Sequence, residues 1–292
     1  MRIHNVLIVS LLLITLLVAV PRPAPLVSTS SCAMTTLDIG QGDAIVFTTP
    51  DHHTILFDGG PGASILDALG RQLPPGTRTI DVVVLTHPDA DHLAGLVSVL
   101  EQYEVTTVVT TGVEVKTQLF QRWKQALAEE QTNIVHAQAG QTLAVGQQFR
   151  FEEVWPERDF RSVVWTESSK NGIGGTNDTS VGGRVTCAGS TVMMTGDLSH
   201  DVEERLAQHP ENIRSSILKA GHHGSRYSTS LTFLQAVQPD LIVISVGKKN
   251  RYGHPHPTVL DRLNRLRIPL LRTDELGDIT LRSAPGGRWV KK

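Results

Sequence analysis

The segment Thr86–His92 follows directly on the apolar run Val82–Leu85. An unbroken apolar run of this length is typical of a strand whose two faces are both covered by other elements. A helix is predicted next, over Leu93–Glu101. Four side chains that can bind a metal ion therefore lie at the exit of a buried strand: His87, Asp89, Asp91 and His92. Whether they form a metal centre depends on ligands supplied by distant parts of the chain.

From Ala33 onward, strand and helix patterns alternate. Helices are predicted at Ala63–Leu73, Lys116–Glu130, Asp201–Gln208, Leu231–Val237 and Thr258–Leu266. Strands are predicted at Thr35–Ile39, Ala44–Thr48, Thr54–Phe57, Asn133–Val135, Thr142–Val145, Phe149–Trp155, Val181–Cys187, Thr191–Thr195, Ile217–Ala220 and Leu241–Ser245, and near Leu270 and Ile279. Strands and helices occur in both halves of the chain, which indicates an α/β (α+β) fold. We expect a four-layer αββα sandwich, with two mixed sheets face to face and helices outside.

The N-terminal segment differs from the rest. Residues 6–20 are apolar except for Ser10 and Thr15, and the Pro-rich stretch Pro21–Pro25 follows. Fifteen apolar residues are short for a membrane span, which needs roughly 20. We predict that residues 1–30 are a signal peptide or short membrane anchor with a linker, and that residues 31–292 are a single domain. Membrane contact would then come only through residues 6–20, if uncleaved; a strand or helix of the fold is the less favoured alternative.

Net charge and cysteine content exclude some functions. The formal net charge of −2 provides no global basic field to hold nucleic acid, so a polyanion would need a local patch or metal ions. Two cysteines, Cys32 and Cys187, form neither a disulfide framework nor a thiolate zinc cluster. Two free thiols are favoured over a disulfide between them. The polar, Gly-rich segment Glu157–Asn177 is predicted to be a long mobile loop, a type of segment that is often functional.

Three further predicted strands end in residues that can bind a metal. Asp197 follows Met193 and Met194, although a helix N-cap is an alternative role. His222 and His223 lie between glycines, which have little packing value but allow close backbone approach. His254 and His256 alternate with prolines in a loop that could also be only a rigid turn. Because loops at one edge of a sheet converge in space, these strand ends together predict a single site.

The joint pattern resembles the metallo-β-lactamase-fold hydrolases. Within them it is most similar to the extracytoplasmic hydrolase domain of the competence DNA-uptake protein ComEC. The matching segments are Leu37–Ala44, Phe57–Gly60, Thr86–His92, Asn177–Ser180, Thr195–Asp197, His222–Ser225 and Asn250–His254. The superfamily signature is HxHxDH, and here Asp89 occupies the place of its second His, as in the ComEC-like branch. The multi-helix membrane channel of full ComEC is absent, so the chain resembles a free-standing copy of this one domain.

The resemblance implies a binuclear metal centre. His87 and Asp89 would bind the first metal, Asp91 and His92 the second, and Asp197 would bridge both. His222 or His223 would complete the second site, with His222 favoured because it comes first after the strand. The third His of the first site has no clear counterpart, and Asn177 or Asp178 lies where it is expected. Asp58 resembles a residue that supports ligands from behind; Asp43 lies near the site without an assigned role.

The ligand types bear on the metals and the reaction. Replacing imidazole by carboxylate hardens the ligand set, so Zn or Mn is expected and Mg is possible. Two metal ions suit phosphodiester hydrolysis, in which the transition-state oxygens carry the charge. Asp91, Asp197 and His254 are candidate catalytic residues, with His254 a general acid or phosphate-orienting group. The substrate-binding candidates are Lys248, Lys249, Asn250, Arg251 and Ser225, although a solvated loop is an alternative role for the basic cluster.

These interpretations favour a phosphodiesterase or nuclease outside the cytoplasmic membrane, either secreted or anchored. Its substrate would be DNA or another phosphodiester, and a DNA-uptake machinery is a possible partner. Another hydrolase of the same fold is an alternative: a lactonase, a phosphocholine-type esterase or a β-lactamase. Asp89 weighs against the β-lactamase, and the basic cluster weighs against the lactonase. A catalytically silent surface-binding module is a further alternative, against which stands the retained set of His and Asp residues.

Overall fold

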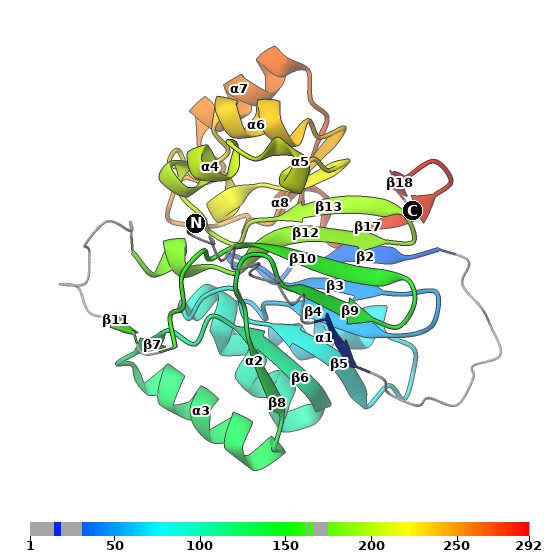
Figure 1. Ribbon diagram of the computed structural model, residues 1–292, viewed down its shortest axis with the longest axis vertical. Helices are drawn as coiled ribbons and strands as arrows, with labels where there is room; N and C mark the ends of the chain where they lie inside the picture. Colours follow the sequence, from blue (N-terminus) through cyan, green and yellow to red (C-terminus); the bar gives the residue numbers. More distant parts are fainter. Residues whose placement is uncertain (1–14, 19–30, 162, 166–174, 292) are drawn as a thin grey trace, which may run out of the picture.

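The computed structural model describes residues 15–18, 31–161, 163–165 and 175–291 (Figure 1). Most of the predicted leader lies outside these residues. Within it, the strand β1 (Thr15–Val18) pairs in parallel with β9 (Thr142–Val145). Much of the predicted loop Glu157–Asn177 also lies outside them. Among the helices that the structure describes, none has the length and hydropathy that a membrane crossing requires.

One eight-stranded sheet of the described chain has the order β18-β17-β2-β3-β4-β5-β6-β8. Its strands are β2 (Ala33–Thr36), β3 (Ile45–Thr48), β4 (Thr54–Phe57), β5 (Thr79–Val84), β6 (Glu104–Thr110), β8 (Asn133–His136), β17 (Ile279–Ala284) and β18 (Arg288–Lys291). From β4 to β8 the pairing is parallel, and the remaining pairs are antiparallel. The C-terminal strands thus complete the sheet that the first half of the chain builds.

The second eight-stranded sheet of the described residues has the order β1-β9-β10-β12-β13-β14-β15-β16. Its remaining strands are β10 (Phe149–Trp155), β12 (Gly182–Cys187), β13 (Ser190–Met194), β14 (Ile217–Lys219), β15 (Leu241–Ile244) and β16 (Leu270–Arg272). The hairpin β12–β13 is antiparallel, whereas β13 to β16 run parallel. A small parallel pair, β7 (Glu114–Val115) with β11 (Val164–Trp165), lies apart from both sheets.

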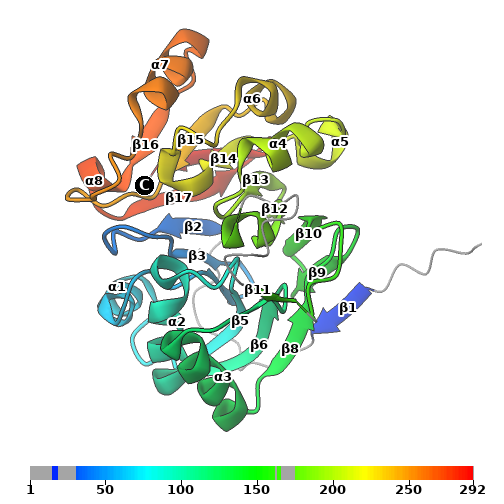
Figure 2. The same cartoon turned by 90° about the vertical axis from the view of Figure 1, so that its left-hand side faces the viewer.

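Helices cover the outer face of each sheet (Figure 2). The first sheet carries α1 (Ser64–Gln72), α2 (Ala90–Gln102) and α3 (Gln118–Glu130). The second carries α4 (His200–Leu206), α5 (Pro210–Ile213), α6 (Leu231–Val237) and α7 (Pro257–Leu266). The short α8 (Thr273–Leu276) joins β16 to β17, and the described residues also include the 3₁₀ turns η2 (Thr176–Thr179) and η3 (Gly221–Gly224). The predicted four-layer sandwich is therefore confirmed.

The side-chain pattern of the central strands explains these layers. In β5, Val82 and Val84 face the core between the two sheets, and Val83 packs into the core beneath the helices. In β4, Ile55 and Phe57 likewise face the inner core. Strands buried on both faces consist of consecutive apolar residues because neither face meets water. A third core lies between the second sheet and its helices.

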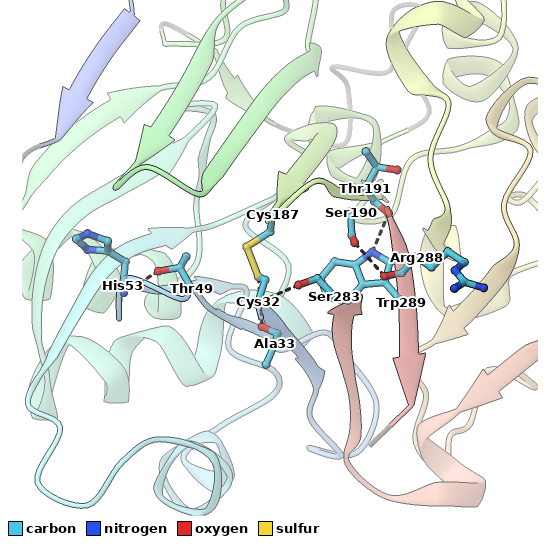
Figure 3. The surroundings of a disulfide bond; sticks show 10 residues. All are labelled: Cys32, Ala33, Thr49, His53, Cys187, Ser190, Thr191, Ser283, Arg288 and Trp289. Atoms are coloured by element: carbon cyan, nitrogen blue, oxygen red, sulfur yellow. Dashed lines mark hydrogen bonds between the residues drawn. A yellow bond between two sulfur atoms is a disulfide. The ribbon is translucent and has the colours of Figure 1, made fainter. Parts of the chain in front are cut away.

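The two cysteines form a disulfide, which corrects the prediction of two free thiols (Figure 3). Cys32 precedes β2 in one sheet and Cys187 ends β12 in the other, and their Cα atoms lie 5.9 Å apart. Both are fully buried in the core between the sheets. The backbone N–H of Cys32 donates to Ser283 Oγ of β17. A separation of 155 residues gave no local sequence signal for the pair; the packing of the two sheets brings them together.

Candidate metal centre

The candidate residues converge on Asp197, which follows β13 and is 3% exposed. Its Oδ2 atom lies 3.4 Å from His92 Nε2, 3.6 Å from His222 Nε2 and 3.5 Å from His223 Nε2. These residues lie beyond the carboxyl ends of parallel strands of both sheets. Open α/β sheets place ligand sites at such ends. The predicted convergence of distant strand ends is thus present in the fold.

Among the described residues, four groups have the proximity that a metal ion requires, with ligand atoms within 4.8 Å of one another. Two of them consist of predicted ligands: His87 with His92 and Asp197, and Asp91 with His92 and His223. The other two include Asp43: Asp43 with Asp58 and His92, and Asp43 with Asp197 and His223. The Nε2 atoms of His87, His92 and His223 are buried and lack a hydrogen-bond partner. A buried nitrogen without a partner is costly, and a metal ion would relieve that cost. The residues present therefore fit divalent metal ions.

The outer nitrogens of the buried histidines are already occupied. Nδ1 of His92 lies 2.8 Å from Asp58 Oδ2, and Asp58 in turn accepts hydrogen bonds from Thr86 N–H and Oγ1–H at 2.8 and 2.7 Å. Nδ1 of His223 lies 3.0 Å from Ser245 O and 3.3 Å from Asp43 Oδ1. Such contacts orient imidazoles that bind metals through the other nitrogen. Asp58 and Asp43 thus each contact the Nδ1 atom of a histidine and leave its Nε2 atom directed at the centre.

The position of Asp43 depends on a close approach between the backbone of its neighbour Gly42 and that of Asp91. The residue before it, Gly42, has a φ of +134°, and a Cβ atom at this position would lie 2.1 Å from Asp91 O. Only glycine fits, because the clash would be with backbone rather than with a movable side chain. The N–H of Asp43 donates to the same Asp91 carbonyl at 3.2 Å. The Gly-flanked turn therefore joins the start of α2 to the underside of the centre.

The adjacent histidines differ in their surroundings. His222 and His223 both have positive φ values, +46° and +54°, in the 3₁₀ turn η3. Non-glycine residues rarely adopt this backbone, and such strain concentrates at functional sites. His223 is 1% exposed and belongs to two candidate metal groups, whereas the side chain of His222 is 32% exposed and belongs to none of those found in the described chain. Asn177 Nδ2 lies 3.2 Å from Nδ1 of His222.

The remaining predicted ligands lie at the rim. Asp91 Oδ2 is 3.5 Å from His223 Nε2. Asp89 precedes α2, and its Oδ2 lies 3.9 Å from His87 Nε2 while its Oδ1 accepts a hydrogen bond from Thr176 at 2.6 Å. The carboxylate of Asp178 accepts the N–H of Ser199 at 2.9 Å. Asp89 thus lies near His87, and Asn177 lies near His222.

The electrostatics of the centre follow from its buried carboxylates. Burial lowers the pKa of His223, but Asp197 and Asp43 outweigh burial and raise it to about 9. Burial opposes ionisation of Asp197 as well, yet His223 and His92 hold its pKa well below the usual range. Burial lowers the pKa of His87, and the neighbouring His92 lowers it further. Carboxylates and imidazoles in this group therefore shift one another's pKa values, as expected of functional sites.

Sequence reasoning missed Lys219, the last residue of β14. It is fully buried, its Nζ contacts the Asp43 carboxylate, and it donates to Gly196 O at 2.8 Å. Burial lowers the pKa of Lys219, but Asp43 and Asp197 outweigh it and raise the pKa. The signal in the sequence was a charged residue at the end of the apolar strand Ile217–Lys219, directly before the glycine-flanked histidines. Also missed was Ser180, whose Oγ lies 3.3 Å from His87 Nδ1 and accepts the N–H of Asp197 at 3.1 Å.

A solvent-open hollow of about 310 Å³ adjoins the centre. Its lining combines Asp91 with three residues of the loop after β15, Lys249, Arg251 and Tyr252. Asn250 also contributes, but its side chain mainly holds the loop: it donates to Gly247 O and His254 O and accepts the N–H groups of Tyr252 and His254. Lys248 is exposed outside this lining.

Two other predicted residues complete the surroundings. His254 lies behind Tyr252, with ring centroids 5.8 Å apart in a stacked arrangement, and 5.4 Å from the ring of His222. Burial, with His222 and His223, lowers the pKa of His254 to about 4, so its imidazole is neutral at pH 7. Ser225 is buried, and its hydroxyl accepts the N–H of Tyr227. Its side chain therefore serves the loop rather than the hollow.

The fold and these His and Asp clusters define a class of protein: the chain belongs to the metallo-beta-lactamase superfamily, whose sequence profile matches residues 37–248. It is similar to ComE operon protein 3 of Bacillus subtilis, at 31% identity over 270 residues, covering 84% of this chain and 32% of that protein. It is similar to competence protein ComA of Neisseria gonorrhoeae, at 30% identity, covering 88% and 33%. The chain thus spans about a third of the length of these relatives.

A solved structure shares the fold. CmlA, a diiron beta-hydroxylase from Streptomyces venezuelae, superposes with a TM-score of 0.54 at 14% identity, covering 89% of this chain and 55% of that one. At this identity the likeness concerns the fold alone.

Proposed function

We propose that the chain is a metal-dependent phosphodiesterase that cleaves DNA outside the cytoplasmic membrane. The observation that carries the proposal is the hollow lined by Lys249 and Arg251, which reaches the candidate metal centre at Asp91. Lys249 and Arg251 would bind the negatively charged phosphates of a phosphodiester backbone, and metal ions at the centre would neutralise its anionic oxygens. A neutral lactone ring offers no comparable charge to this surface.

The ligands would be His87, Asp89 and Asp197 for one metal ion and Asp91, His92, His223 and Asp197 for the other, with His222 and Asn177 beside the first. When bound, two divalent ions supply Lewis-acid charge for the oxygens of the transition state. The mixture of imidazole and carboxylate suits Zn or Mn, and Mg to a lesser extent.

The chain's own residues would bind and orient the substrate. Lys249 and Arg251 would hold phosphates that flank the scissile one, and the exposed ring of Tyr252 offers a stacking surface for a base. His254 is neutral at pH 7, so it would donate a neutral N–H hydrogen bond to a phosphate oxygen rather than act as a charged acid. Of the two roles that the sequence left open for His254, general acid or phosphate-orienting group, the neutral imidazole favours the second.

Location and partners follow from other observations. The Cys32–Cys187 disulfide supports an oxidising compartment, since disulfides are rare where thiols are kept reduced. The similarity to competence proteins supports a role in DNA uptake, with that machinery as the partner. Secretion remains part of the same proposal, whereas anchoring through residues 6–20 would require β1 to leave its pairing with β9.

A substrate panel with several metals tests the function. With added Mn²⁺, the purified chain should hydrolyse a DNA oligonucleotide and bis-nitrophenyl phosphate. Asp91→Ala should lower this activity at least about a hundredfold, because it removes a ligand and the carboxylate beside the hollow. Asp261→Ala, a change of an exposed aspartate on α7, should leave the activity unchanged. Hydrolysis of a lactone or β-lactam without any phosphodiester cleavage would overturn the proposal, and metal binding without any hydrolysis would favour the silent binding module.

A further inference from the structure

Lys219 is a buried cation beneath the candidate metal centre. It ends β14, whose other residues, Ile217 and Leu218, pack into two different apolar cores. Its side chain is fully buried. Lysine is almost never fully buried unless it is paired, because its charge loses hydration. The contacts of its ammonium group must therefore account for its place in the fold.

These contacts involve two carboxylates of the centre. The Nζ atom of Lys219 contacts Oδ2 of Asp43 and lies 3.6 Å from Oδ1 of Asp197. The other oxygen of each carboxylate faces a histidine: Asp43 Oδ1 lies 3.3 Å from His223 Nδ1, and Asp197 Oδ2 lies 3.5 Å from His223 Nε2. Lys219 thus faces one oxygen of each carboxylate and leaves the second oxygen on the histidine side. A third contact, the hydrogen bond to Gly196 O at 2.8 Å, fixes the ammonium itself.

The charges explain why such a cation is needed. One carboxylate oxygen of Asp43, one of Asp197 and a ring nitrogen of His223 lie within 4.8 Å of one another, and all three residues are buried. Two like charges this close in a buried site repel each other strongly. In protein without bound metal, the ammonium of Lys219 compensates part of this repulsion. With metal ions bound, the same ammonium lies close to other cations and opposes their binding.

We propose that Lys219 is a positioning residue that acts as a built-in third cation of the centre. It holds Asp43 and Asp197 in the ligand-ready orientation when metal is absent, and it weakens metal binding when metal is present. The inference rests on the metal-binding part of the proposed function and is independent of the substrate.

The test is Lys219→Met in the full chain, which keeps most of the side-chain volume and removes the charge. Thermal unfolding is measured in EDTA and with saturating Mn²⁺ or Zn²⁺. In EDTA we expect the variant to unfold about 10 °C lower than the wild type, because a buried pair loses one partner. The rise in unfolding temperature on adding metal should be larger in the variant, and a competing chelator should show metal binding tighter by about tenfold or more. Equal losses with and without metal, and unchanged affinity, would mean that Lys219 only fills space.

A second variant keeps the test decisive if Lys219→Met fails to fold. Lys219→Met combined with Asp43→Asn removes a positive and a negative charge together, so its metal-free stability should exceed that of Lys219→Met alone. A double variant no more stable than the single one would refute charge compensation. Wild-type protein that shows no thermal shift with either metal would refute the role of Lys219 toward metal. Metal binding without phosphodiester cleavage would leave this inference standing while the proposed reaction fails, because no readout here uses a substrate.

Discussion

His222 and His223 are neighbours in the chain but meet different surroundings. The Nδ1 atom of His223 is held by Ser245 O and Asp43, and its Nε2 is buried without a partner near Asp91 and Asp197. His222 lies nearer to solvent, against Asn177 and His254. An imidazole held at one nitrogen and free at the other is ready to bind a metal ion. His223 therefore has the stronger claim as a ligand.

The first prediction separates the two histidines. His223→Ala should lower metal affinity about tenfold or more and should remove about one of two metal equivalents at limiting metal, because a fixed buried ligand is lost. His222→Ala serves as the matched variant and should have a smaller effect. Metal content after dialysis and chelator competition measure both. Equal losses would contradict the distinction.

The site shows how far residue patterns carry. His and Asp residues at strand ends could be predicted because the strand before each one is a clear apolar run, and sheet edges bring such ends together. The preference between His222 and His223 could not be predicted, because sequence order suggested the first. In the structure His223 is buried against Ser245 and Asp43, whereas the side chain of His222 is 32% exposed. For Lys219 the sequence offered only a charged residue at the end of an apolar strand. Its burial could not be predicted, since a lysine at a strand end normally reaches water, and its partners Asp43 and Asp197 lie far from it in the chain.

At the scale of elements, the loop after β15 presents Tyr252 to solvent. Its side chain is 65% exposed, stacks on His254, and lines the hollow beside Asp91. Tyr227, in the loop after η3, has the same 65% exposure beside Arg226 but is not in that lining. The two tyrosines thus form a natural pair of test and control.

The second prediction uses this pair. Base stacking on an aromatic side chain contributes roughly 1–3 kcal/mol. Tyr252→Ala should therefore raise the KM for a single-stranded oligonucleotide about tenfold with little change in kcat, while Tyr252→Phe stays near wild type. Tyr227→Ala should leave both constants unchanged. A similar loss for both alanine variants, or none for Tyr252→Ala, would show that Tyr252 has no stacking role.

Glu203 connects two helices of the outer layer. It lies in α4, is fully buried, and accepts the N–H groups of Thr229 and Ser230 at 2.6 and 2.7 Å, just before α6 begins. Burial raises the pKa of Glu203 to about 7, despite these two hydrogen bonds. The folded protein therefore keeps this proton to a higher pH than the unfolded chain does.

The third prediction follows from that difference. Stability from Glu203 is fully present below its unfolded pKa of 4.5 and is lost as the pH rises through about 7, by about 3 kcal/mol in total. The free energy of unfolding, measured with a denaturant between pH 5 and 8, should therefore fall more steeply with pH for the wild type than for Glu203→Gln. Glu153, whose pKa burial also raises to about 7, is present in both proteins, so only their difference reports Glu203. Parallel pH profiles would contradict the prediction.

Prediction of the elements succeeded where apolar periodicity was local. The strands Thr54–Phe57, Thr142–Val145 and Phe149–Trp155 and the helix Leu231–Val237 match the structure. The strand β6, Glu104–Thr110, was missed because its threonines and terminal glutamate weaken the pattern, although Val108 and Val109 are fully buried. Its identity as a strand depends on parallel pairing with β5 and β8, which no local window contains.

On the scale of the whole molecule, the two sheets are joined by the core between them and by one covalent link. Across this core Phe47 meets Phe149, and Phe57 meets Phe151, both edge-to-face. The Cys32–Cys187 disulfide crosses the same layer and closes a loop of 155 residues (Figure 3). The metal centre draws its residues from both sheets, so whatever holds the sheets in register also holds the centre.

The last prediction concerns this link. Cross-linking residues so distant in the chain restricts the unfolded state, and disulfides of this kind contribute about 2–5 kcal/mol. Cys32→Ala combined with Cys187→Ala should lower the free energy of unfolding in guanidinium chloride by that amount. Added reductant should shift the wild-type midpoint toward that of the variant, because the buried disulfide becomes accessible to reductant on unfolding, and should leave the variant unchanged. Identical midpoints for both proteins, with no effect of reductant on either, would mean that the two cysteines remain free thiols and that the sheets are held by apolar packing alone.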